Sequence, residues 1–168
     1  MRAVSSATRA RRLLTLVGVG GAVVVADQWT KDLVLKASQA GQLPFHLIPG
    51  ILDVRLVFNT GAAFSIGAGG GATLLFTVLA LVICLGIGLW FWFDEDLPRL
   101  SILGLSAVAG GGIGNMIDRV VSGQVTDFLA TTFIDFPVFN VADIAVTCGV
   151  VVSLAAILLG TRRDGQAR

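Results

Sequence analysis

The sequence predicts an all-α membrane protein with four transmembrane helices, a small β-rich outer flap, and a short interfacial segment between the third and fourth helices. Hydrophobic residues make up 55% of the 168-residue chain and charged residues 14%, against roughly 25% charged residues in a soluble domain. Apolar runs recur at lengths that can cross a bilayer, which takes about 20 residues. The whole chain, residues 1–168, is therefore expected to form a single integral-membrane domain.

The first predicted span covers residues 13–35. Its apolar core ends at Ala26, so it reaches spanning length only if the helix continues through Asp27 and Lys31. Arginines before an apolar core of this length are also typical of a cleavable signal peptide. The further apolar residues 33–35 favour a retained helix.

The other predicted spans are 72–93, 100–119 and 139–160. A short charged turn joins the second and third, which predicts antiparallel neighbours. In the third span Gly110 and Gly114 form a small-xxx-small pair that lets helices approach closely. This glycine run could be mistaken for a nucleotide-binding loop, but no strand precedes it and no Lys-Ser/Thr pair follows it.

Two longer connections, residues 36–71 and 120–138, are expected on the outer side. Leu52, Val54, Leu56 and Phe58 recur with a period of two, which predicts a short strand in the first connection. In the second, the apolar residues 128–136 are too few to span the bilayer, so this segment is expected at the membrane interface.

The distribution of basic residues predicts the orientation. Eight arginines would lie on the side of the two termini and four basic residues on the other side. The positive-inside rule therefore predicts that both termini are cytoplasmic. A net charge of +1 gives no reason to expect a nucleic-acid partner.

Three of the predicted helices carry a polar stripe near the outer end. The stripes are Asp27 and Lys31 in the first span; Asn115, Asp118 and Arg119 in the third; and Asn140, Asp143 and Thr147 in the fourth. Residues spaced by three or four share a helix face, and polar residues in membrane spans normally face the bundle interior or a water-filled cavity. The stripes predict one polar pocket near the outer surface.

Asp127 and Asp143 are the candidate catalytic pair. The sequence offers Lys31 as a partner for Asp27 and Arg119 as a partner for Asp118, whereas Asp127 and Asp143 have no adjacent base. Two close carboxylates cannot both ionise cheaply, so one proton is shared. Such a pair can activate water for peptide hydrolysis.

Five motifs occur in a fixed order along the chain. They are Asp-Gln-Trp-Thr-Lys at 27–31, Asn-Thr-Gly-Ala-Ala-Phe-Ser at 59–65, Gly-Asn-Met-Ile-Asp-Arg at 114–119, Val-Thr-Asp-Phe at 125–128 and Phe-Asn-Val-Ala-Asp at 139–143. Together they resemble the ordered motifs of the lipoprotein signal peptidases, also called signal peptidase II. The resemblance covers the chain from Leu13 to Gly160.

The resemblance implies a bacterial inner-membrane aspartic endopeptidase with its site near the outer face. Such enzymes cleave the signal peptide of a prolipoprotein just before its diacylglyceryl-modified cysteine. The implied catalytic residues are Asp127 and Asp143. The implied lining and supporting residues are Asp27, Lys31, Asn59, Gly61, Asn115, Asp118, Arg119 and Asn140. The expected partners are the lipidated precursor and membrane lipid, with no metal or other cofactor, and we expect a monomer.

Three other functions are compatible with parts of the sequence. A metal-dependent lipid phosphotransferase could use Asp118, Asp127 and Asp143 as Mg²⁺ ligands, although dense DxxD spacing is missing. A proton-coupled transporter subunit could use the carboxylates as a relay, but the four spans show no inverted repeat. A serine–lysine peptidase could use Ser65 and Lys31.

Overall fold

The computed structural model describes residues 4–61, 71–94 and 96–166. These form helices α1 (Ser6–Gln39), α2 (Gly71–Phe93), α3 (Arg99–Ser122) and α4 (Val141–Gln166), and strands β1 (Phe45–Ile48), β2 (Leu52–Asn59) and β3 (Val125–Thr131). Each helix contains a stretch long and apolar enough to cross a membrane. The predicted fold class, four spanning helices with a β flap, is confirmed.

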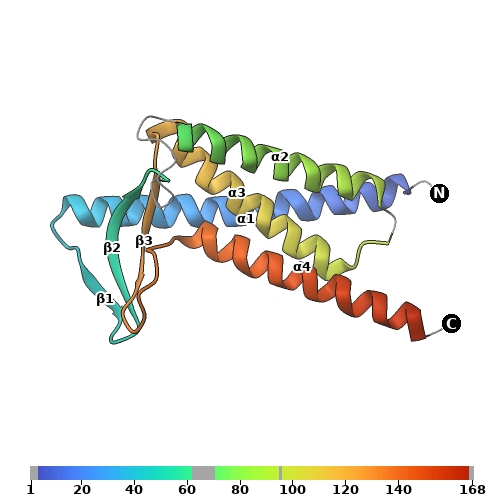
Figure 1. Ribbon diagram of the computed structural model, residues 1–168. Helices are drawn as coiled ribbons and strands as arrows, with labels where there is room; N and C mark the ends of the chain where they lie inside the picture. Colours follow the sequence, from blue (N-terminus) through green and yellow to red (C-terminus); the bar gives the residue numbers. More distant parts are fainter. Residues whose placement is uncertain (1–3, 62–70, 95, 167–168) are drawn as a thin grey trace.

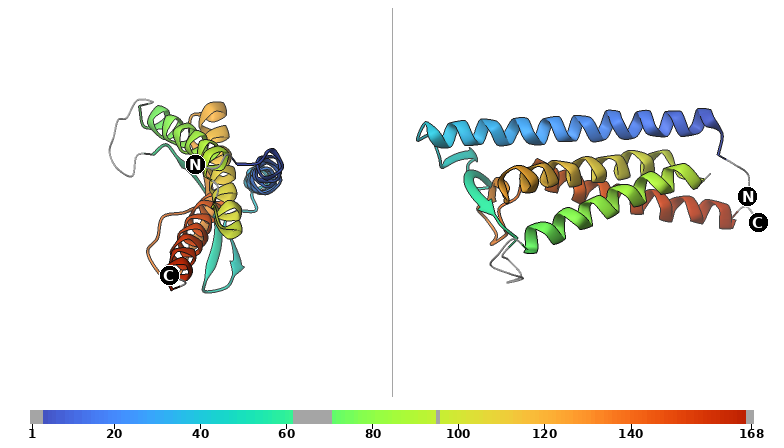
Figure 2. Two further views of the ribbon diagram at one scale, coloured as in Figure 1. Left: turned by 90° about the vertical axis from the view of Figure 1, so that its right-hand side faces the viewer. Right: turned by 90° about the horizontal axis from the view of Figure 1, so that it is seen from above.

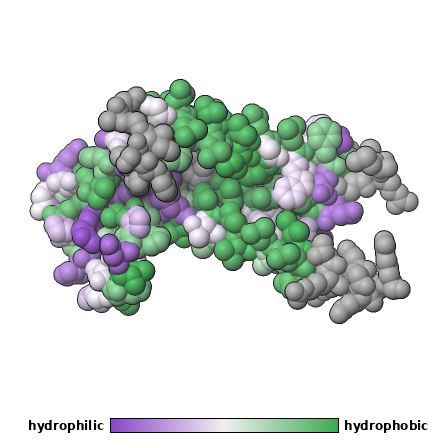
Figure 3. Space-filling view, viewed as in Figure 1, coloured by the Kyte–Doolittle hydropathy of each residue, from purple (hydrophilic) through white to green (hydrophobic). Residues whose placement is uncertain are grey.

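The helices run along one axis, with the sheet at one end of the bundle. The N-terminal end of α1 and the C-terminal end of α4 lie at the opposite end (Figure 1). α3 packs against each of the other three helices and lies between them (Figure 2). The surface along the middle of the bundle is apolar, and polar residues gather toward its two ends (Figure 3). An apolar belt between polar ends is what a bilayer requires.

Glycines on α3 allow its neighbours to come close. A Cβ atom added at Gly110 would lie 2.5 Å from the carbonyl oxygen of Gly20 in α1, and one added at Gly111 would meet the carbonyl oxygen of Ala142 in α4. A larger residue at either position would push the helices apart. α3 can therefore hold polar side chains from α1 and α4 within hydrogen-bond reach of its own.

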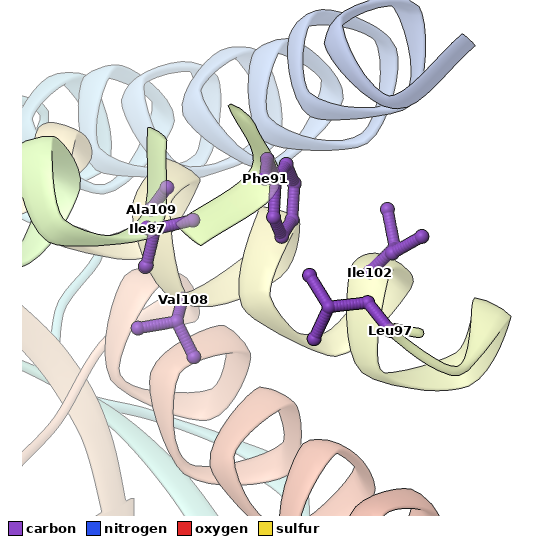
Figure 4. Packing of buried hydrophobic residues seen from close by; sticks show 6 residues of the cluster. All are labelled: Ile87, Phe91, Leu97, Ile102, Val108 and Ala109. Atoms are coloured by element: carbon purple, nitrogen blue, oxygen red, sulfur yellow. The ribbon is translucent and has the colours of Figure 1, made fainter. Parts of the chain in front are cut away.

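The end of the bundle away from the sheet is held by apolar packing. Its cluster consists of Ile87, Phe91, Leu97, Ile102, Val108 and Ala109, contributed by α2, α3 and the turn between them (Figure 4). The buried side chain of Arg12 donates from Nη1 to the carbonyl oxygens of Phe91, at 3.0 Å, and Asp94. A cation at the C-terminal end of a helix is favourable, so Arg12 ties α1 to the end of α2.

The three strands form one antiparallel sheet in the order β1-β2-β3. The strand predicted from the alternation at 52–58 is β2. The interfacial segment predicted between the third and fourth helices instead contains β3, which pairs with β2 and is almost wholly buried. Val54, Phe128 and Leu129 pack with Val34 of α1 beneath the sheet, and this burial explains why an apolar stretch lies in a strand.

Candidate active site

Polar side chains from each of the three stripes meet at the sheet end of the bundle. Residues from α1, α3, α4, β2 and β3 form one connected set of hydrogen bonds and ion pairs. The pocket predicted from the helix faces is thus a feature of the fold. It is built in two layers, one around Lys31 and one around Asp127 and Asp143.

Lys31 is the centre of the first layer. Its ammonium nitrogen lies 2.7 Å from Asp27 Oδ2 and 2.9 Å from Asp118 Oδ2, and it donates to Asn115 Oδ1 at 3.0 Å. Three partners use all three N–H donors of a lysine. The predicted pair of Asp27 and Lys31 is confirmed.

The pairing predicted for Asp118 is wrong, because its cation is Lys31 and not Arg119. Neighbouring residues of a helix do not face each other, whereas Lys31 approaches Asp118 from another helix. Arg119 instead donates to the carbonyl oxygen of Asn115 at 3.3 Å, and its guanidinium lies 5.2 Å from the centroid of the Phe76 ring in α2.

The two carboxylates that bind Lys31 also hold backbone next to the candidate dyad. Asp27 Oδ1 accepts a hydrogen bond from the backbone N–H of Ala142 at 3.0 Å, and Asp118 Oδ2 accepts one from the backbone N–H of Thr126 at 2.9 Å. Ala142 and Thr126 directly precede Asp143 and Asp127 in the chain. The Lys31 layer therefore fixes the backbone from which each dyad side chain projects.

Gln28 also joins this layer, although the sequence analysis did not select it. Its amide nitrogen donates to Asp118 Oδ1 at 2.9 Å and to the carbonyl oxygen of Gly114 at 3.2 Å. A side chain that binds α3 from α1 in this way holds the two helices in register. Its signal in the sequence was its position as a polar residue in the predicted first span.

Asp143 lies in the first turn of α4 and takes part in a capping box. Asn140 Oδ1 accepts from the backbone N–H of Asp143 at 3.0 Å, and Asp143 Oδ2 accepts from the backbone N–H of Asn140 at 3.1 Å. This reciprocal arrangement satisfies N–H groups that a helix start leaves without partners. Asp143 Oδ1 accepts from Asn115 Nδ2 at 2.8 Å, so both of its oxygens are held.

Asp127 is buried in β3 and faces two amide side chains. Asn140 Nδ2 donates to its Oδ1 at 2.7 Å, and Asn59 Nδ2 donates to its Oδ2 at 2.9 Å. Burial raises the pKa of Asp127, and the neighbouring charge of Asp143 raises it further, although the two amide donors and Lys31 act in the opposite direction. Asn140 contacts both carboxylates and so brings the two aspartates together.

Asn59 is fixed by a turn at the end of β2. Its Oδ1 accepts from the backbone N–H of Gly61 at 2.8 Å, which leaves its Nδ2 free to donate to Asp127. Gly61 has a φ of +80°, a conformation that a side chain disfavours. The predicted role of Gly61 is thus a backbone one, while Phe64 and Ser65 of the same motif lie outside the described residues.

A cavity of about 440 Å³ opens beside the two aspartates. Asn59, Asp127 and Asp143 form its polar end. Its walls are Phe136, Pro137, Val138 and Phe139 on one side and Ile144, Thr147 and Cys148 of α4 on the other. The carboxylates of Asp127 and Asp143 therefore line a cavity whose other residues are largely apolar. Phe136 belongs to the predicted interfacial segment. The rest of this wall, residues 137–139, was not predicted, because its position depends on β3 and on the bridge between Leu129 and Phe139.

Asp118, Asp127 and Asp143, the ligands in the phosphotransferase alternative, each have other partners in the structure. Within the described ranges, no three His, Cys, Asp or Glu side chains are grouped as ligands for a metal. Asp118 is turned to Lys31 and the backbone of Thr126. Asn140 instead holds Asp127 through its side-chain Nδ2 and Asp143 through its backbone N–H, so that two carboxyl groups lie beside one residue.

Comparison with known proteins identifies the family. A model of the family described as signal peptidase (SPase) II matches residues 19–159. The chain belongs to the signal peptidase II family. Both candidate aspartates and all eight of the implied lining and supporting residues fall within the matched range.

The similarity to individual relatives and to a solved structure extends over most of the chain. A lipoprotein signal peptidase from Thermosynechococcus vestitus is 40% identical over 136 residues, which cover 79% of this chain and 84% of the relative. One from Brevibacillus brevis is 37% identical over 147 residues, covering 87% and 96%. A solved structure described as a bacterial membrane enzyme matches with a TM-score of 0.74 and 31% identity, covering 88% of this chain and 89% of that one.

Proposed function

We propose that this protein is an aspartic endopeptidase that removes the signal peptide of diacylglyceryl-modified prolipoproteins just before the lipidated cysteine, with Asp127 and Asp143 as its catalytic pair. The single observation that carries the assignment is that Asn140 donates hydrogen bonds to both carboxylates, which line a largely apolar cavity. Membership of a family of signal peptidases supports a peptidase over a lipid phosphotransferase.

The two aspartates have different surroundings, and this assigns their roles. Asp127 is buried, with a raised pKa, so it is the member that holds the proton. Asp143 lies in the first turn of a helix, where a negative charge is favourable. Asp143 therefore takes a proton from water, which attacks the carbonyl carbon of the scissile bond. Asp127 donates to the carbonyl oxygen, and a proton then passes to the departing amine as the C–N bond breaks.

The cavity gives the lipid portion of the substrate a place beside the dyad. Its aromatic and aliphatic walls suit acyl chains, and its polar end suits a peptide bond. The signal peptide is itself a transmembrane helix, so its cleavage region must be extended before a carboxylate can reach it. The neighbouring sheet, with Asn59 at the end of β2, offers strand-like pairing to such a segment.

The site works within one chain and faces the outer surface in this proposal. In this proposal the protein acts as a monomer. The arginine asymmetry supports cytoplasmic termini. The sheet, which carries Asn59 and Asp127, lies at the other end of the bundle (Figure 1). In a Cys84→Ala, Cys148→Ala background, a single cysteine introduced at Gln42 should react with an impermeant reagent on intact cells, and one at Ser6 should not. The opposite labelling pattern would reverse the orientation.

The function is tested by two precursors that differ only in lipid. Purified protein should release the signal peptide from a diacylglyceryl precursor and leave its unlipidated twin uncut, with the chelator EDTA having no effect. Cleavage of both precursors at equal rates would contradict the lipid requirement. Loss of activity in EDTA, restored by Mg²⁺, would instead support metal-dependent chemistry.

A further inference from the structure

Thr147 of α4 lines the cavity but takes no part in either layer of the site. It follows Asp143 by four residues, so its side chain lies on the same face of α4 and about one turn, 5.4 Å, further from the helix start. The side chain is exposed. Apart from Asn59, Asp127, Asp143 and Cys148, the residues that line the cavity with Thr147 are apolar.

The hydroxyl of Thr147 differs from four others in the spanning helices. Thr30, Thr77, Ser106 and Ser153 each donate to the carbonyl oxygen four residues earlier, at 2.7–2.8 Å. That local bond is how a hydroxyl is normally satisfied inside a helix. Thr147 makes no hydrogen bond with any residue that the structure describes, although the carbonyl of Asp143 lies at the equivalent position.

Because the side chain of Thr147 is exposed, a water molecule can satisfy its hydroxyl while the cavity holds no substrate. A substrate that fills the cavity displaces this water and must then offer the hydroxyl a partner, since an unpaired polar group is unfavourable away from water. A valine would have the same shape without that requirement. A polar group in this position therefore points to a hydrogen-bonding partner that enters the cavity.

Building on the proposed function, we propose that the Thr147 hydroxyl donates a hydrogen bond to an ester carbonyl of the substrate's diacylglyceryl group. The thioether and the glycerol carbons place the ester carbonyls several single bonds from the scissile bond. That reach suits one helical turn, about 5.4 Å, between Asp143 and Thr147. The acyl chains then continue along Phe136, Val138 and Ile144. Thr147 is thus a specificity-determining residue that recognises the head of the lipid.

The test combines an isosteric variant with an isosteric substrate. Thr147→Val removes the hydroxyl and keeps the branched shape, while Thr147→Ser keeps the hydroxyl. The two precursors carry a diacylglyceryl or a dialkylglyceryl group of equal chain length, so that the second lacks both ester carbonyls. Thr77→Val is the matched control, because Thr77 also lies in a span but bonds within its own helix and does not line the cavity.

One neutral hydrogen bond is worth about 0.5–1.5 kcal/mol, so Thr147→Val should raise the KM for the diester roughly two- to tenfold. The kcat should stay near the wild-type value, because the lost contact is remote from the reacting atoms. Wild-type protein should prefer the diester to the diether by the same factor, and Thr147→Val should cut both precursors alike. Thr147→Ser should recover the preference, and Thr77→Val should keep it.

Two results would overturn the inference. One is a wild-type protein that does not distinguish the two precursors, a result that needs no variant to fold. The other is a Thr147→Val protein that loses the same factor on both precursors or on neither, since the hydroxyl would then contact the peptide or nothing. The proposed function fails separately, if Asp127→Asn or Asp143→Asn still cleaves the diester precursor.

Discussion

Two pairs of aspartates lie side by side at the sheet end of the bundle, and the protein treats them differently. Asp27 and Asp118 share the ammonium of Lys31 and bind backbone N–H groups. Asp127 and Asp143, within the described part of the chain, are held by neutral amide donors alone and line the cavity. The ammonium of Lys31 and the two backbone N–H groups hold the first two carboxylates in position. The proposed mechanism assigns proton transfer to the other two.

The largest effect on activity is expected when a carboxylate of the dyad is removed. Asp127→Asn and Asp143→Asn should each reduce cleavage of a diacylglyceryl precursor by roughly 10²–10⁴-fold or more, since each removes an acid or base group. The double variant should be little worse than either single one, because residues that act as a unit are not additive. Both single variants should still insert and bind the precursor. Substantial cleavage by either single variant, if it is well folded, would contradict the aspartic mechanism.

Removing Lys31 should act on stability first and on activity as a consequence. Lys31→Ala leaves two buried carboxylates without their cation, and breaking a buried pair costs about 3–5 kcal/mol. The melting temperature in detergent should fall together with the cleavage rate. Lys36→Ala is the matched control, because Lys36 also pairs with an aspartate four residues away, Asp32 at 2.6 Å, but both side chains are exposed. An unchanged melting temperature with lost activity would place Lys31 among the catalytic groups.

The link between the two pairs is Asn115, and its removal should have a smaller effect. Asn115 Oδ1 accepts from Lys31 and from Asn140, while its Nδ2 donates to Asp143. Asn115→Ala leaves all four carboxylates in place but frees Asp143 on one side. We expect a loss of kcat of about tenfold to a hundredfold, as for a small misplacement of a reacting group, with a stability loss smaller than that of Lys31→Ala. An equal loss of stability in the two variants would show that Asn115 belongs to the Lys31 layer alone.

The features that could be predicted from the sequence are those that depend on local spacing along the chain. The spans were predictable because apolar runs report helices directly, and Asp27 with Lys31 because residues four apart share a helix face. The partner of Asp118 was not predictable in the same way, since Lys31 reaches it from another helix. Nor was β3, because Val125–Thr131 is apolar enough for a membrane interface and becomes a strand only by pairing with β2.

The sequence leads to the proposal that Asp127 and Asp143 form the dyad, whereas it does not predict the hydrogen bonds that hold them. Asp127 and Asp143 were selected because neither has a base next to it. That Asn140 bridges them, and that Asn59 binds Asp127 from β2, follows from the sheet and from the capping box of α4. Contacts between distant segments of this kind leave no local pattern in the chain.

The smallest expected effect is a change in how stability depends on pH. Folding raises the pKa of Asp127, chiefly through burial, so the folded protein keeps this proton over a pH range in which the unfolded chain has lost it. Stability therefore falls as the pH rises through that range, by about 1.4 kcal/mol for each unit by which the pKa is raised. Asp127→Asn should lack this component, and Asp32→Asn on the exposed pair should retain it. Identical pH profiles for wild type and Asp127→Asn would contradict the shift.

The central claim is that Asp127, one of the two carboxyl groups held by neutral N–H donors, carries the proton of the proposed dyad. Infrared difference spectroscopy across a pH titration measures this directly, through the carbonyl stretch of a protonated carboxyl group. We predict a band that persists above about pH 4, the ordinary range for an aspartate, in wild type and in Asp27→Asn, and that is missing from Asp127→Asn. A band that disappears in Asp27→Asn and survives in Asp127→Asn would contradict the account.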